Sequence, residues 1–133
     1  MAVLTELPVD SQITVRGEPP LAPNTCTDTE LWLGPDEWLV LGAREQDYEI
    51  ACDVGANRVV FELAGPGARS VLASGTSIDL RALTPGRCAQ TLLGRAQVIL
   101  QCTANDAFRI LVRPSFAPYL RAWLDDAIAG VRA

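Results

Sequence analysis

Alternating apolar and polar residues predict strands over much of the chain. The clearest strand patterns, rich in β-branched and aromatic residues or bounded by turn signals, cover 11–17, 31–33, 37–42, 58–64 and 108–113. Gly34-Pro35-Asp36 is a strong turn signal between the second and third of these. Residues 88–102 are also strand-forming, with a break at Gly94-Arg95, and 103–106 (TAND) predicts a hairpin turn.

A short helix is predicted at 66–74. Gly65 would stand at the N-cap and Pro66 at the first helical position, while Gly75 would take the left-handed conformation that ends the helix. The same stretch raises the alternative of a phosphate-binding loop, but Ser70 occupies the third position of a GxGxxG pattern and no Gly-Lys pair follows. We therefore interpret the glycines as capping residues, and an anion at the helix N-terminus stays open.

The C-terminal stretch predicts a longer amphipathic helix. Ser115 is a natural N-cap and Pro118 suits the first turn. One helical stripe is apolar throughout: Phe116, Leu120, Trp123, Leu124, Ala127, Ile128 and Val131. We expect this stripe, Trp123 included, to pack against the core.

This order of elements predicts an α+β fold: one antiparallel sheet with two main helices packed on one face. At 133 residues the chain is expected to form a single domain, 1–133. Within it, 1–30 would be a strand plus an extended Pro-rich connector, and 31–133 the compact core.

Composition removes several classes of chemistry. The chain has no histidine and no lysine, so an imidazole base, a Ser-His-Asp triad and a Schiff base are excluded. Its net charge is −5 and its eleven arginines are spread along the sequence, which argues against a nucleic-acid partner. No apolar run is long enough for a membrane helix and the first residues carry no basic region, so we expect a cytoplasmic location without a membrane partner.

The four cysteines, at 26, 52, 88 and 102, form no CxxC pair, so neither a zinc site nor a thioredoxin-like motif is predicted. We expect reduced thiols. If Gly94-Arg95 is a tight turn, Cys88 and Cys102 should be cross-strand neighbours.

Two pairs of residues are the candidates for binding. Trp32 and Trp38 compete with neighbouring leucines for the core, so we expect at least one on an exposed apolar patch that contacts a partner. Arg69 and Arg113 are the natural contacts for a carboxylate if the chain instead binds a small acidic ligand. No catalytic, metal-binding or cofactor-binding residue is predicted.

Several segments together resemble one family. They are LWLGPDEWLVLG (31–42), DVGAN (53–57), VVFELAGPGARSVLASGTSIDL (59–80), PGRCAQTLL (85–93) and FRILVRPSFAPYLRAWL (108–124). In this order they resemble the gamma subunit of heterotetrameric sarcosine oxidase, which is structurally related to the folate-binding aminomethyltransferase group. Gamma chains are usually longer, and the connector at 43–52 is short by comparison.

The resemblance implies an accessory, non-catalytic subunit that packs against a large alpha subunit, with beta and delta subunits in the same heterotetramer. Such complexes oxidise sarcosine to glycine, form hydrogen peroxide and pass the one-carbon unit to tetrahydrofolate. FAD, FMN, NAD and the folate would be held by alpha and beta, and zinc by delta. A related secondary amine as substrate, or a stand-alone domain that binds a folate-like acid, are the alternatives.

Overall fold

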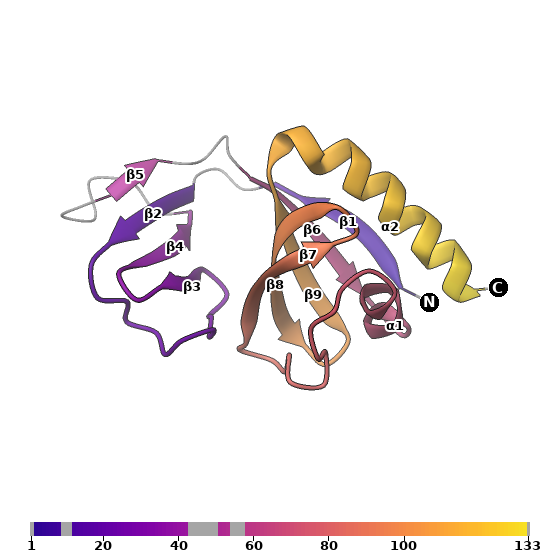
Figure 1. Cartoon of the computed structure of the whole chain (residues 1–133), viewed down its shortest axis with the longest axis horizontal. Coiled ribbons are helices and arrows are strands. Elements are labelled where there is room, and N and C mark those ends of the chain that lie inside the picture. The colour runs from indigo at the N-terminus through magenta and orange to yellow at the C-terminus, as the bar shows by residue number, and fades with distance from the viewer. Residues whose placement is uncertain (1, 9–11, 43–50, 54–57, 133) are drawn as a thin grey trace.

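A computed structural model describes residues 2–8, 12–42, 51–53 and 58–132. Over these residues the strands form two antiparallel sheets, and two α-helices cover one of them (Figure 1). The α+β class, the antiparallel pairing and the two helices confirm the prediction. The single expected sheet is corrected to two, because 12–16 pairs with 37–41 and 51–53 and not with the strands from 59 onward.

The large sheet has the strand order β1-β6-β9-β8-β7. Its strands are β1 (Val3–Leu7), β6 (Val59–Ala64), β7 (Cys88–Leu93), β8 (Ala96–Ala104) and β9 (Ala107–Val112). The predicted turns at Gly94-Arg95 and within 103–106 are both present as hairpins. The strand β1 was not predicted, and it pairs with β6 at the edge of the sheet.

The small sheet has the order β3-β4-β2-β5. Its strands are β2 (Gln12–Arg16), β3 (Glu30–Gly34), β4 (Glu37–Leu41) and β5 (Ala51–Asp53). The predicted Gly34-Pro35-Asp36 turn joins β3 to β4. Residues 1–30 thus supply a strand to each sheet, and the Pro-rich connector runs from β2 to β3.

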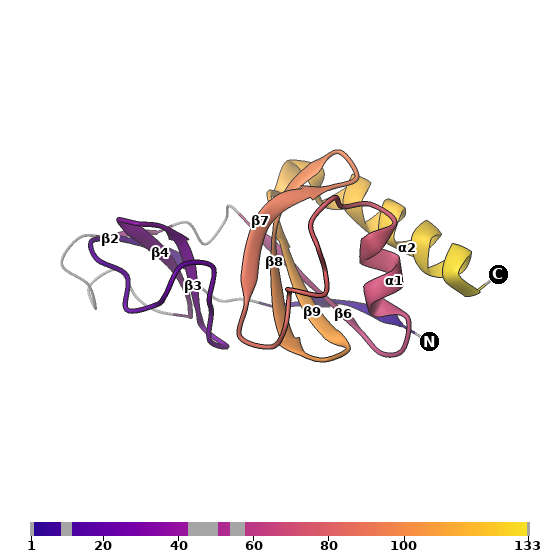
Figure 2. The same ribbon diagram turned by 60° about the horizontal axis from the view of Figure 1, so that its bottom comes forward.

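The helices α1 (Ala68–Ala73) and α2 (Ala117–Arg132) lie on the same side of the large sheet (Figure 2). Val71 and Leu72 of α1 and Leu120 and Leu124 of α2 are fully buried against Phe108 and its neighbours. The predicted stripe therefore packs as expected over most of its length. Phe116 is an exception, since it is 44% exposed in the short 3-10 turn η2 (Pro114–Phe116).

The predicted helix caps need correction. Gly67, with φ of 90°, is the N-cap of α1, so Gly65 and Pro66 belong to the turn before it. Gly75 is not in the left-handed region. Glycine is required there because a Cβ would collide with the indole of Trp123. Ser115 lies inside η2 and does not cap α2.

The two faces of the large sheet bury separate clusters. Strand alternation sends Phe61, Leu100 and Ile110 toward the helices, and Val60, Ile99 and Leu111 toward the small sheet. The small sheet meets this second group with a leucine face made by Leu31, Leu33, Leu39 and Leu41. We call the side of the large sheet that faces away from the helices its outer face.

Candidate functional site

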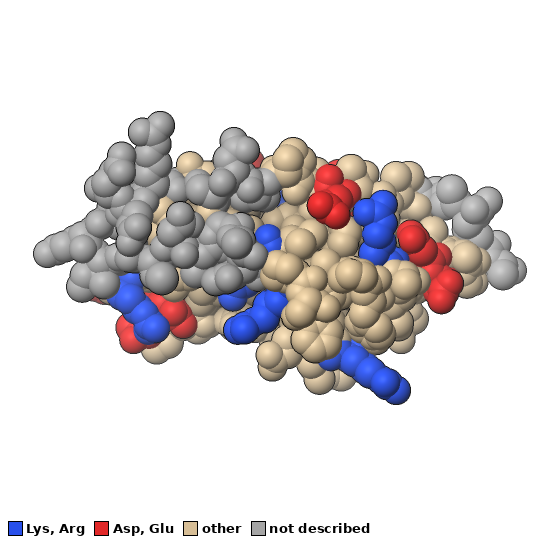
Figure 3. All heavy atoms as spheres, turned by 90° about the horizontal axis from the view of Figure 1, so that it is seen from above, with Lys and Arg blue, Asp and Glu red and all other residues tan. Residues whose placement is uncertain are grey.

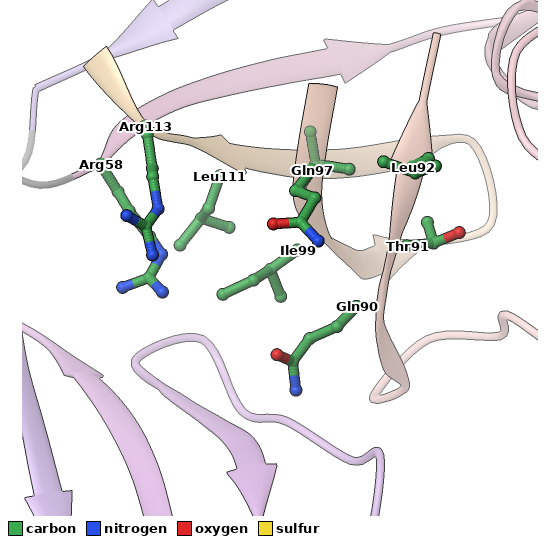
Figure 4. A pocket seen from close by; sticks show the side chains of 9 residues that line it. Arg58, Gln90, Thr91, Leu92, Gln97, Ile99, Leu111 and Arg113 are labelled. Atoms are coloured by element: carbon green, nitrogen blue, oxygen red, sulfur yellow. The ribbon is translucent and has the colours of Figure 1, made fainter. Parts of the chain in front are cut away.

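A hollow of about 260 Å³ lies on the outer face of the large sheet (Figure 4). The side chains of Arg58 and Arg113 stand at one end of it, and Ile99 and Leu111 lie beneath. Gln90 and Gln97 border the remaining side. Polar groups therefore surround an apolar floor, which is the usual construction of a small ligand site.

Strand register explains why these residues meet. Gln90, Ile99, Leu111 and Val60 are successive partners across β7, β8, β9 and β6, so they form one row across the outer face. Two residues further along the strands, the next row on the same face contains Leu92, Gln97, Arg113 and Arg58. An apolar row thus lies directly beside a row that ends in two arginines.

Contacts between the two sheets fix the edges of this hollow. The Gln90 side chain donates from Nε2 to the Leu33 carbonyl at 2.7 Å. The buried Gln12 side chain donates from Nε2 to the Arg58 carbonyl at 2.8 Å, and this hydrogen bond fixes the backbone at Arg58. Small-sheet residues thus hold the side chain of Gln90 and the backbone of Arg58 in place.

The two guanidinium groups influence one another electrostatically. Burial and the positive charge of Arg113 lower the pKa of Arg58, and Glu37 partly opposes this effect. Among the described residues neither arginine forms an ion pair; the Glu37 carboxylate lies 3.6 Å from Arg16 instead. The hollow is therefore a focus of positive charge on an acidic protein.

The structure separates the two predicted ligand arginines. Arg113 is in the hollow, but Arg69 lies on α1, on the opposite face of the sheet. Its guanidinium donates to the carbonyls of Leu80 (2.6 Å) and Asn105 (3.1 Å) and lies 5.0 Å from the centre of the Phe108 ring. Arg69 thus ties α1 to two loops and does not share a site with Arg113.

The two predicted partner residues lie together on the small sheet. Trp32 and Trp38 are directly opposite one another on β3 and β4, on the face that points away from the leucine face. Trp38 is buried at 9% exposure and Trp32 is half-buried. Neither ring is among the exposed large apolar side chains, so the expected exposed apolar patch at a tryptophan is not present, although Trp32 keeps part of its surface open to solvent.

The large apolar side chains that are exposed lie elsewhere. In the described part of the chain they are Val3, Leu92, Phe116 and Tyr119.

The cysteine pairing expected from the hairpin is also wrong. The turn is two residues long, so Cys88 pairs with Gln101, and Cys102 points to the opposite face. Cys88 instead lies beside Cys26, where the hydrogen bond with the Cys26 sulfur and burial raise the pKa of Cys88. Burial likewise raises the pKa of Cys102. Both thiols are buried and free.

Sequence reasoning missed Arg58 and Gln97 as lining residues. Gln97 could have been found by counting along the hairpin. A two-residue turn at Gly94-Arg95 places Leu92 opposite Gln97, and the alternation of side chains then puts Arg113 on the same face. The neighbour of Arg113 could not be deduced, because the pairing of β6 with β9 joins distant segments.

Charge elsewhere on the surface is mixed. Figure 3 shows basic and acidic side chains scattered over one face, with neutral surface between them. No group of three or more potential metal ligands occurs among the described residues. None of the helices in the described ranges is long and apolar enough to cross a membrane.

The fold places the chain in a structural class of oxidase subunits. It superimposes with a TM-score of 0.85 on a chain of a solved structure, the heterotetrameric sarcosine oxidase from Corynebacterium sp. U-96 in complex with pyrrole 2-carboxylate. The match covers 99% of this chain and 86% of the other, at 29% sequence identity.

The chain belongs to the sarcosine oxidase gamma subunit family, whose model matches residues 2–130. It is 36% identical over 113 residues to the sarcosine oxidase subunit gamma of Corynebacterium sp. (strain U-96), and 35% identical over 112 residues to that of an Arthrobacter species. Each alignment covers 74% of this chain but 55% of the relative, so the chain spans about half the length of these curated relatives. The resemblance noted in the sequence is confirmed.

Proposed function

We propose that this chain is a non-catalytic accessory subunit of a sarcosine-oxidase-type assembly and that it packs against the large alpha subunit. The observation that carries the proposal is the fold match, which extends over nearly the whole chain and most of a chain from a heterotetrameric sarcosine oxidase. Family membership over residues 2–130 supports the same assignment. The absence of histidine and lysine from the sequence is consistent with an accessory role.

The chemistry of the assembly would be supplied by the other subunits. The family resemblance implies oxidation of sarcosine, or of a related secondary amine, with transfer of the one-carbon unit to tetrahydrofolate in the cytoplasm. FAD, FMN, NAD and tetrahydrofolate would then be bound by alpha and beta, and zinc by delta. Trp32, which is half-buried in the isolated chain, remains a candidate contact with a partner, next to Trp38.

Co-expression tests this proposal. The chain is produced together with a large folate-domain subunit, a flavoprotein subunit and a small cysteine-rich subunit, which we expect neighbouring reading frames to encode. We expect one complex containing all four chains, with sarcosine-dependent hydrogen peroxide formation that falls when this chain is left out. Elution of the chain apart from the others, together with full activity in its absence, would overturn the proposal.

A direct measurement on the isolated chain addresses the non-catalytic part. We expect the purified chain to show neither visible flavin absorbance nor bound zinc, and to oxidise no amine. Stoichiometric flavin or metal in the isolated chain would contradict an accessory role.

A second candidate function, a stand-alone domain that binds a folate-like or other acidic ligand, is favoured by one observation. Arg113 shares its hollow with a second arginine and an apolar floor. The other arginine expected in this role, Arg69, is held by backbone carbonyls elsewhere.

A further inference from the structure

Two like charges on adjacent strands are an unusual feature of the outer face. Arg58 immediately precedes Val59 and Arg113 immediately follows its partner Val112, so the two arginines occupy facing positions at the start of β6 and the end of β9. Directly opposed like charges destabilise a sheet, by an amount that grows when water is partly excluded. The two guanidinium groups nevertheless point in the same direction, toward one hollow (Figure 4).

Nothing in the described surroundings neutralises this pair. The described ion pairs of this chain use Arg16, Arg81 and Arg121, and Glu37, whose charge acts on Arg58, lies 3.6 Å from Arg16. Gln12 holds the Arg58 carbonyl, so the backbone that carries this guanidinium is fixed. The arrangement therefore places two planar donor groups side by side, with no carboxylate partner among the described residues.

The other lining residues indicate which kind of anion would fit the hollow. Ile99 and Leu111, 4% and 1% exposed, contribute only the edges of their side chains next to the arginines, and Leu92, 52% exposed, supplies most of the apolar surface along the second row. A guanidinium fork matches a carboxylate in a bidentate geometry. The volume of about 260 Å³ lies just below the range of roughly 300–1,000 Å³ for drug-sized ligands, so the ligand must be small.

We propose that this hollow binds a carboxylate attached to a compact apolar group. Arg58 and Arg113 hold the carboxylate between them, and the apolar group lies against Leu92 and the exposed edges of Ile99 and Leu111. The carboxylate belongs either to a free small molecule or to a side chain or chain end of a partner subunit. This site rests on the second candidate function above, a domain that binds an acidic ligand, and does not depend on the chain being an oxidase subunit.

Benzoate is a suitable probe, titrated into the full chain at constant ionic strength and followed by calorimetry. We expect millimolar binding, as is usual for so small a ligand, and much weaker binding of benzyl alcohol, which has the ring but no charge. Arg58→Gln and Arg113→Gln should each weaken benzoate binding by about tenfold or more, because each removes one charged donor group. Arg121→Gln is the matched control: it removes the same charge from the exposed surface of α2, and should leave the affinity unchanged.

The assembled complex distinguishes the two sources of the carboxylate. If a partner subunit supplies it, Arg113→Gln weakens assembly and benzoate competes with assembly. If a free molecule supplies it, assembly is unaffected and the complex loses one benzoate site when it carries Arg113→Gln. Circular dichroism checks that each variant is folded. If Arg58→Gln fails to fold, the test rests on Arg113→Gln, because the Arg113 side chain is exposed. Equal benzoate affinity in wild type and Arg113→Gln, or equal binding of benzyl alcohol and benzoate, would overturn the proposal. So would the absence of benzoate binding together with unchanged assembly of Arg113→Gln.

Discussion

Replacing Gly75 by alanine should destabilise the fold through one identifiable collision. An alanine Cβ at this position would overlap Cζ2 and Cη2 of the Trp123 ring and lie 3.2 Å from Cδ1 of Leu93. The backbone cannot move away easily, because the Gly75 N–H donates to Leu72 and its carbonyl accepts from the Gly94 N–H at 2.9 Å. The indole is therefore the group that must shift, and it already packs against Gly94 on its other side.

Overpacking of this kind costs about 1–3 kcal/mol of unfolding free energy. For a chain of this size each kcal/mol lowers the melting temperature by roughly 3–5 °C. Gly75→Ala should therefore melt several degrees below wild type when followed by circular dichroism. Gly130→Ala is the matched control, since Gly130 lies in α2 with open space around its Cα; it should gain about 0.5–1 kcal/mol from helix propensity.

A double-mutant cycle tests the cause of the Gly75→Ala effect. In a Trp123→Leu background the smaller side chain leaves room for the methyl group, so the cost of Gly75→Ala should fall by about 1–2 kcal/mol, a coupling typical of residues in contact. If Gly75→Ala costs the same in both backgrounds, the collision with Trp123 is not its cause and the reasoning fails.

The remaining predictions concern individual side chains. Trp38→Ala should lose about 3–5 kcal/mol in urea unfolding because the ring is buried, and Trp32→Ala clearly less; equal losses would contradict the burial difference. Hydrogen bonds from the Arg81 side chain and backbone lower the pKa of Asp79, so this pair stabilises the fold at neutral pH and the contribution disappears as the pH falls through the folded-state pKa. In an NMR titration, Arg81→Ala should raise the Asp79 pKa, and an unchanged value would count against the contact. Thiol reagents should react slowly with the folded chain's buried cysteines and find four thiols after unfolding without reductant, whereas two would reveal a disulfide.

Local features of the fold could be predicted from the sequence because their causes are local. The hairpins at Gly94-Arg95 and within 103–106 follow from turn residues between strand-forming segments, and α2 follows from its apolar stripe. The strand β1 escaped notice because its side chains are mostly exposed or half-buried, so its pattern of apolar residues is weak. The assignment of 12–16 to a second sheet could not be deduced, because its partners are fixed by packing between distant segments.

Only part of the candidate site could be predicted from the sequence, because it too depends on contacts between distant segments. Arg113 could be singled out, but its companion Arg58 is set by the pairing of β6 with β9, two strands that are far apart in the sequence. Arg69 was misjudged because its role depends on the loop carbonyls of Leu80 and Asn105, which no sequence pattern places beside it. The exposure of Trp32 was misjudged because its cross-strand partner is another large ring.

The pairing of β1 with β6 has a consequence for how this protein could be shortened. Leu7 and Val60 are direct partners, so the chain leaves the large sheet after β1, builds the entire small sheet and returns at the neighbouring position. In topological terms the small sheet is an insertion into a hairpin, and a short turn could replace it. The excised protein would keep both helices and all five strands of the large sheet, but Ile99 and Leu111 would face water and would need polar replacements. The small sheet could not be isolated in the same way, because among the described residues its leucine face packs only against the large sheet.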